Sequence, residues 1–352
     1  MNKTIQGILT TRRSHGSAGE LAFLSSLHER IKTLGFSPRV MAEGCVVVEV
    51  GEKSKTLFSC HTDTVHSLLE SNGQKQTLVF DENMGHIFLE DKTAGCLGAD
   101  DGAGIYILLT MIEAKVAGTY IFHRGEEKGG IGSRAMVAKH PEWAEEFDRC
   151  IAFDRQDNFE VICTQGGHPC ASVTFGKALS AALNAADTTF SYEVSHKGSF
   201  TDSKVYNYLI PECVNVGVGY QHQHSNAEYL DWAHLQALTA ACLKIDWEAL
   251  PTDRICPLEP VAKQQSFDNF MHYPQGKVYQ PKAASKLTPV LKAPAVVDDP
   301  EYPDVDFVMD STYDELLDMV GDASLVTTLL QLRLRIVKAE AAVATMETIL
   351  GL

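Results

Sequence analysis

The stretch AGIYILLTMIEA (103–114), followed shortly by TYIFH (119–123), contains the clearest indication of the fold. The first segment predicts a buried helix and the second a strand. Working outward, strand-like and helix-like segments alternate, which is typical of an α/β domain. Another helix is predicted over Glu20–Leu34, ending at Gly35. Further strands are predicted at CVVVEV (45–50), TLFSC (56–60), CIAFD (150–154), EVICT (160–164) and CVNVGVG (213–219).

The 352-residue chain is acidic, with a formal net charge of −16. This charge argues against nucleic-acid and anionic-membrane partners, because both require a concentrated basic surface. The nine cysteines are scattered and never form CxxC, which favours free thiols in a reducing compartment. The N-terminus does not resemble a signal peptide, and no apolar run approaches the roughly 20 residues of a membrane helix. We therefore expect a cytoplasmic protein.

The last hundred residues differ in composition from the rest. Nine of the 13 prolines fall between Pro251 and Pro303, and nine acidic residues with no basic one lie between Asp298 and Met319. These shifts predict a catalytic domain over 1–250, a Pro-rich linker or extended arm over 251–307, and an acidic segment with a helix over 308–352. In that helix, apolar residues repeat in steps of four and three, as in a coiled coil. Self-association through this helix is slightly preferred over packing on its own domain. The repeating residues are Leu325, Leu329, Leu332, Ile336, Ala339, Val343, Met346 and Leu350.

Several separate segments of the first 250 residues contain side chains of the kinds that bind metals. Each has a common structural explanation, since aspartates cap helices and polar residues fill strand-end turns. Their joint position favours function, because the carboxyl ends of strands in an open α/β sheet form the crevice where ligands bind. His61, Glu126, Glu127, Asp154 and His224 come just after predicted strands, and Asp100 lies at a loop-to-helix junction.

The residue types fit one chemistry. Two histidines and three carboxylates are a natural ligand set for two divalent zinc ions, with one carboxylate bridging them. A further carboxylate beside the ligands can accept a proton from water. In the pair Glu126 and Glu127, one residue can bind metal while its neighbour accepts the proton. Asp63, two residues after His61 on an extended chain, is expected to fix the tautomer of that histidine.

Five motifs, taken in order, resemble the signatures of the co-catalytic dinuclear zinc exopeptidases. This family includes single-domain bacterial leucyl aminopeptidases and related zinc carboxypeptidases and dipeptidases. The resemblance covers residues 1 to about 250. The motifs are HTDTV (61–65), LGADDGAGI (97–105), HRGEEKGGIGS (123–133), FD (153–154) and HSNAE (224–228).

The resemblance implies a role for each metal ligand. His61 and Asp154 would bind one metal ion, and Glu127 and His224 the other. Asp100 would bridge the two ions. Its peptide bond to the next residue is expected to be cis.

The resemblance also implies the catalytic residues. Glu126 would be the general base and would later protonate the leaving amine, while Asp63 would orient the first histidine ligand. His222 lies in the same loop as His224, but only His224 is followed by the family-like serine and glutamate. Asp202 resembles an acidic position that lines the substrate pocket in some relatives.

The implied fold is a three-layer α/β/α sandwich with a mixed, mostly parallel central sheet, followed by the C-terminal helical tail. Asp154 and His224 are only 70 positions apart. Relatives with a separate lid or dimerisation domain insert about 100 residues there, more than this gap holds. The chain therefore resembles the single-domain aminopeptidase branch.

We expect a metal-dependent hydrolase that cleaves a peptide or amide substrate, with aminopeptidase action as the leading hypothesis. Carboxypeptidase, dipeptidase and amide-deacylase action remain open alternatives. Glutaminyl cyclases share the ligand layout and are a second possibility on the same fold, although they usually bind a single zinc ion. A different class is an assembly or scaffold protein that retains a hydrolase module, which the Pro-rich arm and heptad helix would suit.

Overall fold

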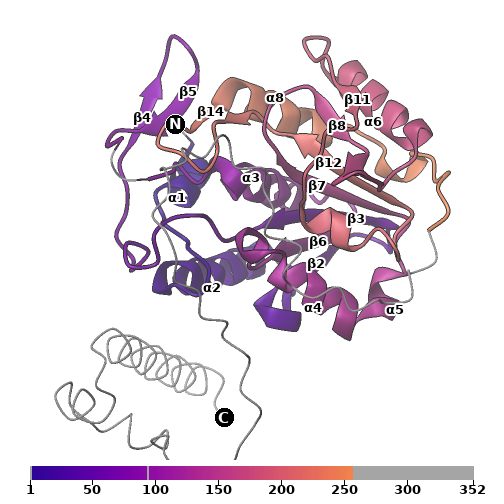
Figure 1. Ribbon diagram of the computed structural model, residues 1–352, viewed down its shortest axis with the longest axis horizontal. Helices are drawn as coiled ribbons and strands as arrows, with labels where there is room; N and C mark the ends of the chain where they lie inside the picture. Colours follow the sequence, from indigo (N-terminus) through magenta and orange to yellow (C-terminus); the bar gives the residue numbers. More distant parts are fainter. Residues whose placement is uncertain (1, 93–94, 257–352) are drawn as a thin grey trace, which may run out of the picture. The chain divides into compact units, whose positions relative to one another are not determined.

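The computed structural model describes residues 2–92 and 95–256. The predicted helix over 308–352, its coiled-coil repeat and nearly all of the Pro-rich segment lie outside the described residues, so these stay predictions. The described part forms a three-layer α/β/α sandwich around a mixed sheet (Figure 1). This confirms the fold class predicted for the first 250 residues.

The central sheet has eight strands in the order β1-β2-β6-β3-β7-β12-β8-β11. The pairs β6/β3, β3/β7, β7/β12 and β8/β11 are parallel. The pairs β1/β2, β2/β6 and β12/β8 are antiparallel. The strand bounds are β1 (Arg39–Val40), β2 (Val46–Val50), β3 (Thr56–His61), β6 (Gly118–His123), β7 (Arg149–Arg155), β8 (Glu160–Ile162), β11 (Glu193–Ser195) and β12 (Glu212–Gly217).

Helices cover both faces of this sheet (Figure 1). Alternation along the strands assigns side chains to opposite cores: Val46 and Val48 pack in the larger one and Val47 in the smaller one. The larger core includes residues of α1 (Lys3–Leu9), α2 (Ala18–Thr33), α3 (Ala99–Glu113), α6 (Val173–Ala186) and α8 (Trp232–Cys242). The smaller core lies under α4 (Ile131–Lys139), α5 (Pro141–Ala144) and α7 (Asp202–Val205).

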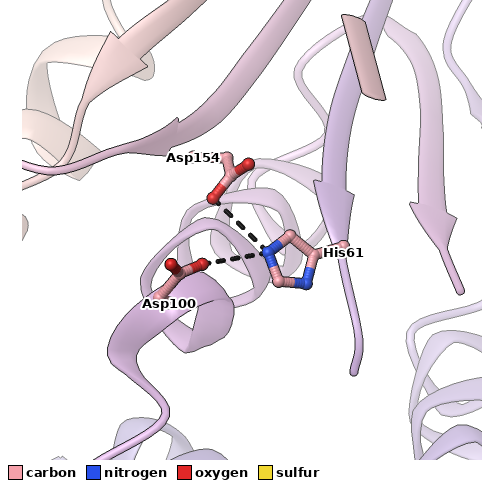
Figure 2. Close-up of side chains that lie close together, drawn as sticks. All are labelled: His61, Asp100 and Asp154. Carbon is pink, nitrogen blue, oxygen red and sulfur yellow. Dashed lines mark hydrogen bonds and ion pairs between the residues drawn. The ribbon is translucent and has the colours of Figure 1, made fainter. Parts of the chain in front are cut away.

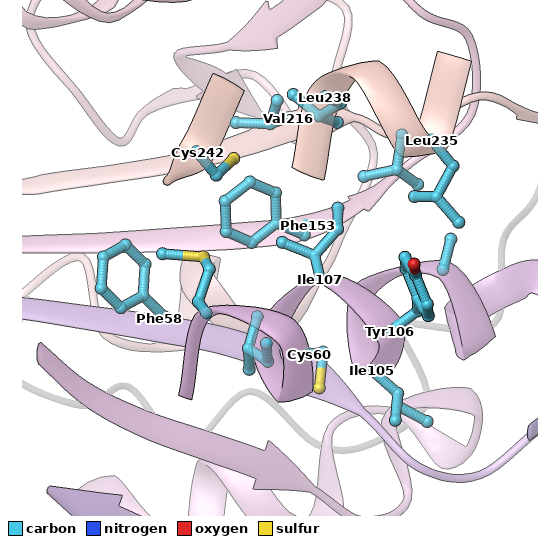
Figure 3. Packing of buried hydrophobic residues seen from close by; sticks show 14 of the residues in the cluster. Phe58, Cys60, Ile105, Tyr106, Ile107, Phe153, Val216, Leu235, Leu238 and Cys242 are labelled. Atoms are coloured by element: carbon cyan, nitrogen blue, oxygen red, sulfur yellow. The ribbon is translucent and has the colours of Figure 1, made fainter. Parts of the chain in front are cut away.

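The helix α3 is the centre of the larger core. Almost all of its side chains are buried, as its apolar sequence predicted. Figure 3 shows Ile107 on the side of this helix that faces α8, in the same cluster as Phe153 and Leu235. Phe58 and Phe153 extend the same layer to Trp247, which meets the Phe58 ring edge-on at 5.0 Å. This packing fixes the start of α3, where the sequence places Asp100.

A smaller antiparallel sheet, in the order β13-β14-β5-β4, was not predicted. Its loops lead to both His224 and Asp100. Three short 3₁₀ helices and one further strand pair lie in the connections between these elements. The bounds are β4 (Leu78–Asp81), β5 (His86–Leu89), β13 (Tyr220–Gln221), β14 (Tyr229–Asp231), η1 (Ala42–Gly44), η2 (Glu126–Lys128), η3 (Trp247–Ala249), β9 (Thr164–Gln165) and β10 (His168–Pro169).

Two other features concern the thiols and the apolar character of the helices. All nine cysteines are free thiols, and eight of them are buried. Among the described residues, the helices are all too short or too polar to cross a membrane.

Candidate metal centre

The ligand residues predicted from the sequence meet at the carboxyl ends of the parallel strands. His61 is the last residue of β3, and Asp154 lies near the end of β7. Glu127 lies in η2, which follows β6. Asp100 stands at the start of α3, and His224 lies in the loop between β13 and β14. We call these five residues, together with Glu126, the rim.

Three rim residues form a first group (Figure 2). His61 Nε2 lies 3.0 Å from Asp100 Oδ1 and 3.4 Å from Asp154 Oδ1. All three side chains are buried. Thr201 donates a hydrogen bond of 2.5 Å to the Asp154 carboxylate, and the Tyr220 hydroxyl donates another of 3.2 Å. The carboxylate is therefore held in place beside the imidazole.

A second group shares Asp100 with the first. His224 Nε2 lies 2.9 Å from Glu127 Oε1 and 3.2 Å from Asp100 Oδ2. The two oxygens of Asp100 are thus directed at two different histidines. This is the arrangement that a carboxylate bridging two cations requires.

The charges of the two groups suit cations. Burial acts to lower the pKa of His61, but Asp154 and Asp100 outweigh it and raise that pKa well above its usual range. Hydrogen bonds to Asp100 and Glu127 raise the pKa of His224 to about 11. The carboxylates therefore favour positive charge beside Nε2 of both histidines. A divalent cation bound there would supply this charge and displace the protons. The donor set of two imidazoles and three carboxylates fits a pair of divalent ions.

Glu126 belongs to neither group of ligands. Burial, reinforced by the negative charges of Asp154 and Asp202, raises the pKa of Glu126 well above its usual range. A carboxyl group with a raised pKa is a stronger base once it has lost its proton, which suits it to proton transfer. Its position in η2, directly before Glu127, puts it beside the second group.

Asp63 contacts both the first histidine and the glutamate pair. Its backbone carbonyl lies 3.0 Å from His61 Nδ1, whereas its carboxylate lies 3.7 Å from the same nitrogen. The carboxylate instead accepts hydrogen bonds from the backbone N–H groups of Glu126 and Glu127, at 3.1 and 3.3 Å. Asp63 therefore links the loop after β3 to the turn after β6.

Asp101 fixes the start of α3 against β3. The peptide bond between Asp100 and Asp101 is cis. The Asp101 carboxylate accepts hydrogen bonds from the backbone N–H groups of His61 and Gly104, at 3.2 and 2.9 Å. A Cβ atom at Gly104 would lie 2.4 Å from the Phe153 carbonyl and 2.5 Å from the Asp101 carboxylate, so only glycine allows this close approach.

Sequence reasoning missed the function of Glu228. Its buried carboxylate accepts hydrogen bonds of 2.7 to 3.1 Å from four consecutive backbone N–H groups. These belong to residues 97–100 and end at Asp100, which the two groups share. The sequence contains only a weak signal for this contact, since Glu228 follows His224 by four residues but is more than 125 residues away from the groups that it binds.

Two further residues singled out in the sequence belong to neither ligand group. The His222 ring lies 5.9 Å from the Tyr229 ring. Asp202 is buried, and its Oδ2 lies 3.3 Å from His123 Nδ1. Burial raises the pKa of Asp202 to about 7, although a hydrogen bond from Ser133 acts to lower it.

Solved structures with a similar fold are peptidases. One is a tripeptidase from Staphylococcus aureus, with a TM-score of 0.53 and 15% identity over 68% of this chain and 95% of that chain. Another is the aminopeptidase PepT from Bacillus cereus, with a TM-score of 0.52 and 14% identity over 68% and 95% of the two chains. The TET1 peptidase from Pyrococcus horikoshii matches with a TM-score of 0.50 and 14% identity over 68% and 97%. No protein-family model and no curated protein matches the sequence. The resemblance to co-catalytic aminopeptidases is therefore confirmed at the level of the fold.

Proposed function

We propose that the chain is a metal-dependent hydrolase of peptide bonds, of the aminopeptidase type. One observation carries this proposal: the two oxygens of Asp100 are directed at His61 and His224, so that two three-residue groups share one carboxylate. The adjacent Glu126, which belongs to neither group, is available for proton transfer. Two divalent ions, with zinc as the favoured metal, match these ligands.

When bound, a pair of divalent ions lowers the pKa of a water molecule and polarises the carbonyl group of the substrate. The protein then supplies the proton transfers. Glu126 accepts a proton from the attacking water and returns it to the leaving amine. The raised pKa of Glu126 favours this cycle. It makes the carboxylate a stronger base toward water, and the carboxyl group can then give the proton to the leaving nitrogen. Asp63 keeps the glutamate in position through its backbone N–H.

The choice between the two ends of a peptide rests on the fold and not on the charge of the rim. The four carboxylates of the rim would be offset by two bound divalent ions, so their charge alone does not select an amino terminus over a free carboxylate. The peptidases with a similar fold include an aminopeptidase and a tripeptidase. We therefore favour cleavage at the amino end over carboxypeptidase, dipeptidase or amide-deacylase action.

Hydrolysis assays with matched variants test this function. Aminoacyl amides, blocked dipeptides and N-acyl amino acids are offered to the chain before and after chelation. We expect Glu126→Gln to lower kcat by about 10² to 10⁴-fold without loss of bound metal. Glu145→Gln, at an exposed glutamate after α5, serves as the control and retains activity. Activity that is indifferent to both chelation and Glu126→Gln would refute the proposal.

The cellular setting and assembly of the chain belong to the same proposal. A reducing, cytoplasmic compartment agrees with the free thiols. The Pyrococcus horikoshii peptidase can assemble into a tetrahedron or an octahedral shell. For the present chain, homo-oligomerisation through the helix over 308–352 is tested by comparing the mass in solution of the full chain with that of a chain ending at residue 256. An unchanged subunit number would reject it.

A further inference from the structure

Arg13 is a buried cation in the segment between α1 and α2. Its side chain is fully buried and donates hydrogen bonds to backbone carbonyl groups. Nε donates to Thr62 at 2.9 Å, and Nη2 donates to Gly98 at 3.2 Å. Nη1 donates to Ile8 at 2.6 Å and to Thr11 at 3.1 Å. One rigid, planar group therefore connects three separate parts of the chain.

Two of these acceptors lie within the ligand loops. Thr62 is the residue between His61 and Asp63, and Gly98 precedes the bridging Asp100 by two positions. The backbone strengthens the first connection, because Thr64 N donates to the Arg13 carbonyl at 3.0 Å. Arg13 thus contacts both the loop of the first histidine and the loop of the shared carboxylate, without contacting any metal ligand itself.

The burial of this charge argues for a role beyond packing. A buried guanidinium is costly to desolvate, and an apolar side chain of similar volume is often at least as stabilising. Burial lowers the pKa of Arg13 to about 10, so the group keeps its charge at neutral pH. Its Cζ atom lies 5.0 Å from the centre of the Phe23 ring, which limits movement of the fork.

We infer that Arg13 is a positioning residue of the metal centre, whose guanidinium fork sets the separation between the His61 loop and the Asp100 loop. This inference rests on the proposed function, since it assigns Arg13 a role toward the bound metals. A lysine side chain cannot reproduce the hydrogen-bond geometry of Arg13. An ammonium group is a compact donor on a flexible stem, whereas the guanidinium presents five N–H groups in a fixed plane.

Titration with Co²⁺ tests the role of Arg13. The variants are Arg13→Lys, which keeps the charge, and Arg13→Gln, which removes it. Arg12→Lys is the matched control, because the neighbouring Arg12 pairs with Glu70 at 3.5 Å instead of with the ligand loops. The readouts are the dissociation constant for Co²⁺ against a competing chelator, the visible absorption bands of the cobalt-saturated protein, and the circular dichroism of the chain.

We expect Arg13→Lys to fold, to bind Co²⁺ about 10 to 100-fold more weakly and to show altered cobalt bands, as for the loss of other groups that orient ligands. Arg12→Lys should match the wild type in all three readouts. Wild-type affinity and bands in Arg13→Lys would overturn the inference. Loss of fold in both Arg13 variants would also overturn it, in favour of a role in overall stability. A wild-type chain that binds no Co²⁺ would refute the proposed function and this inference together, whereas the other two outcomes leave the proposed function intact.

Discussion

The charged side chains at the two ends of the same parallel strands differ in how well they are paired. At the amino ends, Arg149 begins β7 and donates hydrogen bonds to Thr56, Glu248 and the Trp247 carbonyl. Glu212 begins β12 and accepts hydrogen bonds from the Ser172 backbone and hydroxyl groups, at 2.6 and 2.9 Å. We call Thr56, Arg149, Ser172, Glu212 and Glu248 the basal cluster. Its charged side chains all have polar partners.

At the carboxyl ends, the rim contains four carboxylates and only two histidines that could balance their charge. Asp154 and Glu126 have pKa values raised chiefly by burial, which marks them as charges that the fold does not compensate. In the basal cluster, burial acts to raise the pKa of Glu248, but its hydrogen bonds and Arg149 lower it overall. Compensated charge at the amino ends therefore serves stability, whereas uncompensated buried charge at the carboxyl ends indicates a site for an external cation.

The largest effect is expected from removing the shared carboxylate. Asp100→Ala deprives both ligand groups of one member, so metal binding at both should fail. Activity is expected to fall about 10³-fold or more, equivalent to the several kcal/mol that metal ions supply to such reactions. Metal analysis and steady-state kinetics check this outcome. A variant that retains activity would break the distinction between the rim and the basal cluster.

Neutralising an uncompensated acid should stabilise the fold. The pKa of Asp202 is raised to about 7, so the folded state retains a proton at pH values where the unfolded state has released it. This group therefore lowers stability as the pH rises from about 4 to about 7. Asp202→Asn should raise the free energy of unfolding of the chelator-treated chain by up to about 4 kcal/mol at pH 8. Denaturant titrations at pH 8 and pH 4 check the sign, and a gain that is equal at both pH values would contradict it.

Breaking the basal cluster should lower the free energy of unfolding instead of raising it. Arg149→Met removes the cation paired with Glu248 and the donor to the Trp247 and Leu250 carbonyl groups, which is expected to lower the free energy of unfolding by about 3 kcal/mol. The affinity for metal should not change. Denaturant titration and a metal-binding isotherm together check this separation. A large loss of metal affinity in the folded variant would show that the two ends of the strands are coupled.

The smallest effect is expected at a helix cap within the basal cluster. The Ser172 hydroxyl accepts a hydrogen bond from Phe175 N and donates one to Glu212. Ser172→Ala removes both and should lower the free energy of unfolding by about 1 kcal/mol. Thermal unfolding measures this change, with kcat for the aminoacyl amide as the control. A change in kcat without a change in stability would contradict a purely stabilising role for Ser172.

The central sheet and the rim could be predicted from the sequence because their signals are local. Each predicted strand is present within a few residues, as in β2 (Val46–Val50), where β-branched residues are consecutive. The rim residues were recognisable because their types, order and position after strands agree with one chemistry. The cis peptide bond at Asp100 was expected from the resemblance and is present.

The remaining features depend on contacts between distant residues. The strands β5 and β14 pair Phe88 with Tyr229, and each strand is too short to give a periodic pattern. Glu228 and Arg13 act on backbone groups, which no pattern of side chains reveals. The sequence indicates polar residues at both places but not the loops that they hold. Whether Asp202 contacts substrate stays a prediction.

The most direct test counts the metal ions that restore activity. The chain is stripped with a chelator, and Zn²⁺ is added in known equivalents while hydrolysis of an aminoacyl amide is followed. We expect the stripped chain to be inactive, and its activity to rise with added Zn²⁺ and reach a plateau at two equivalents. A stripped chain as active as the original, or Zn²⁺ additions that restore nothing and do not bind, would contradict a two-metal hydrolase.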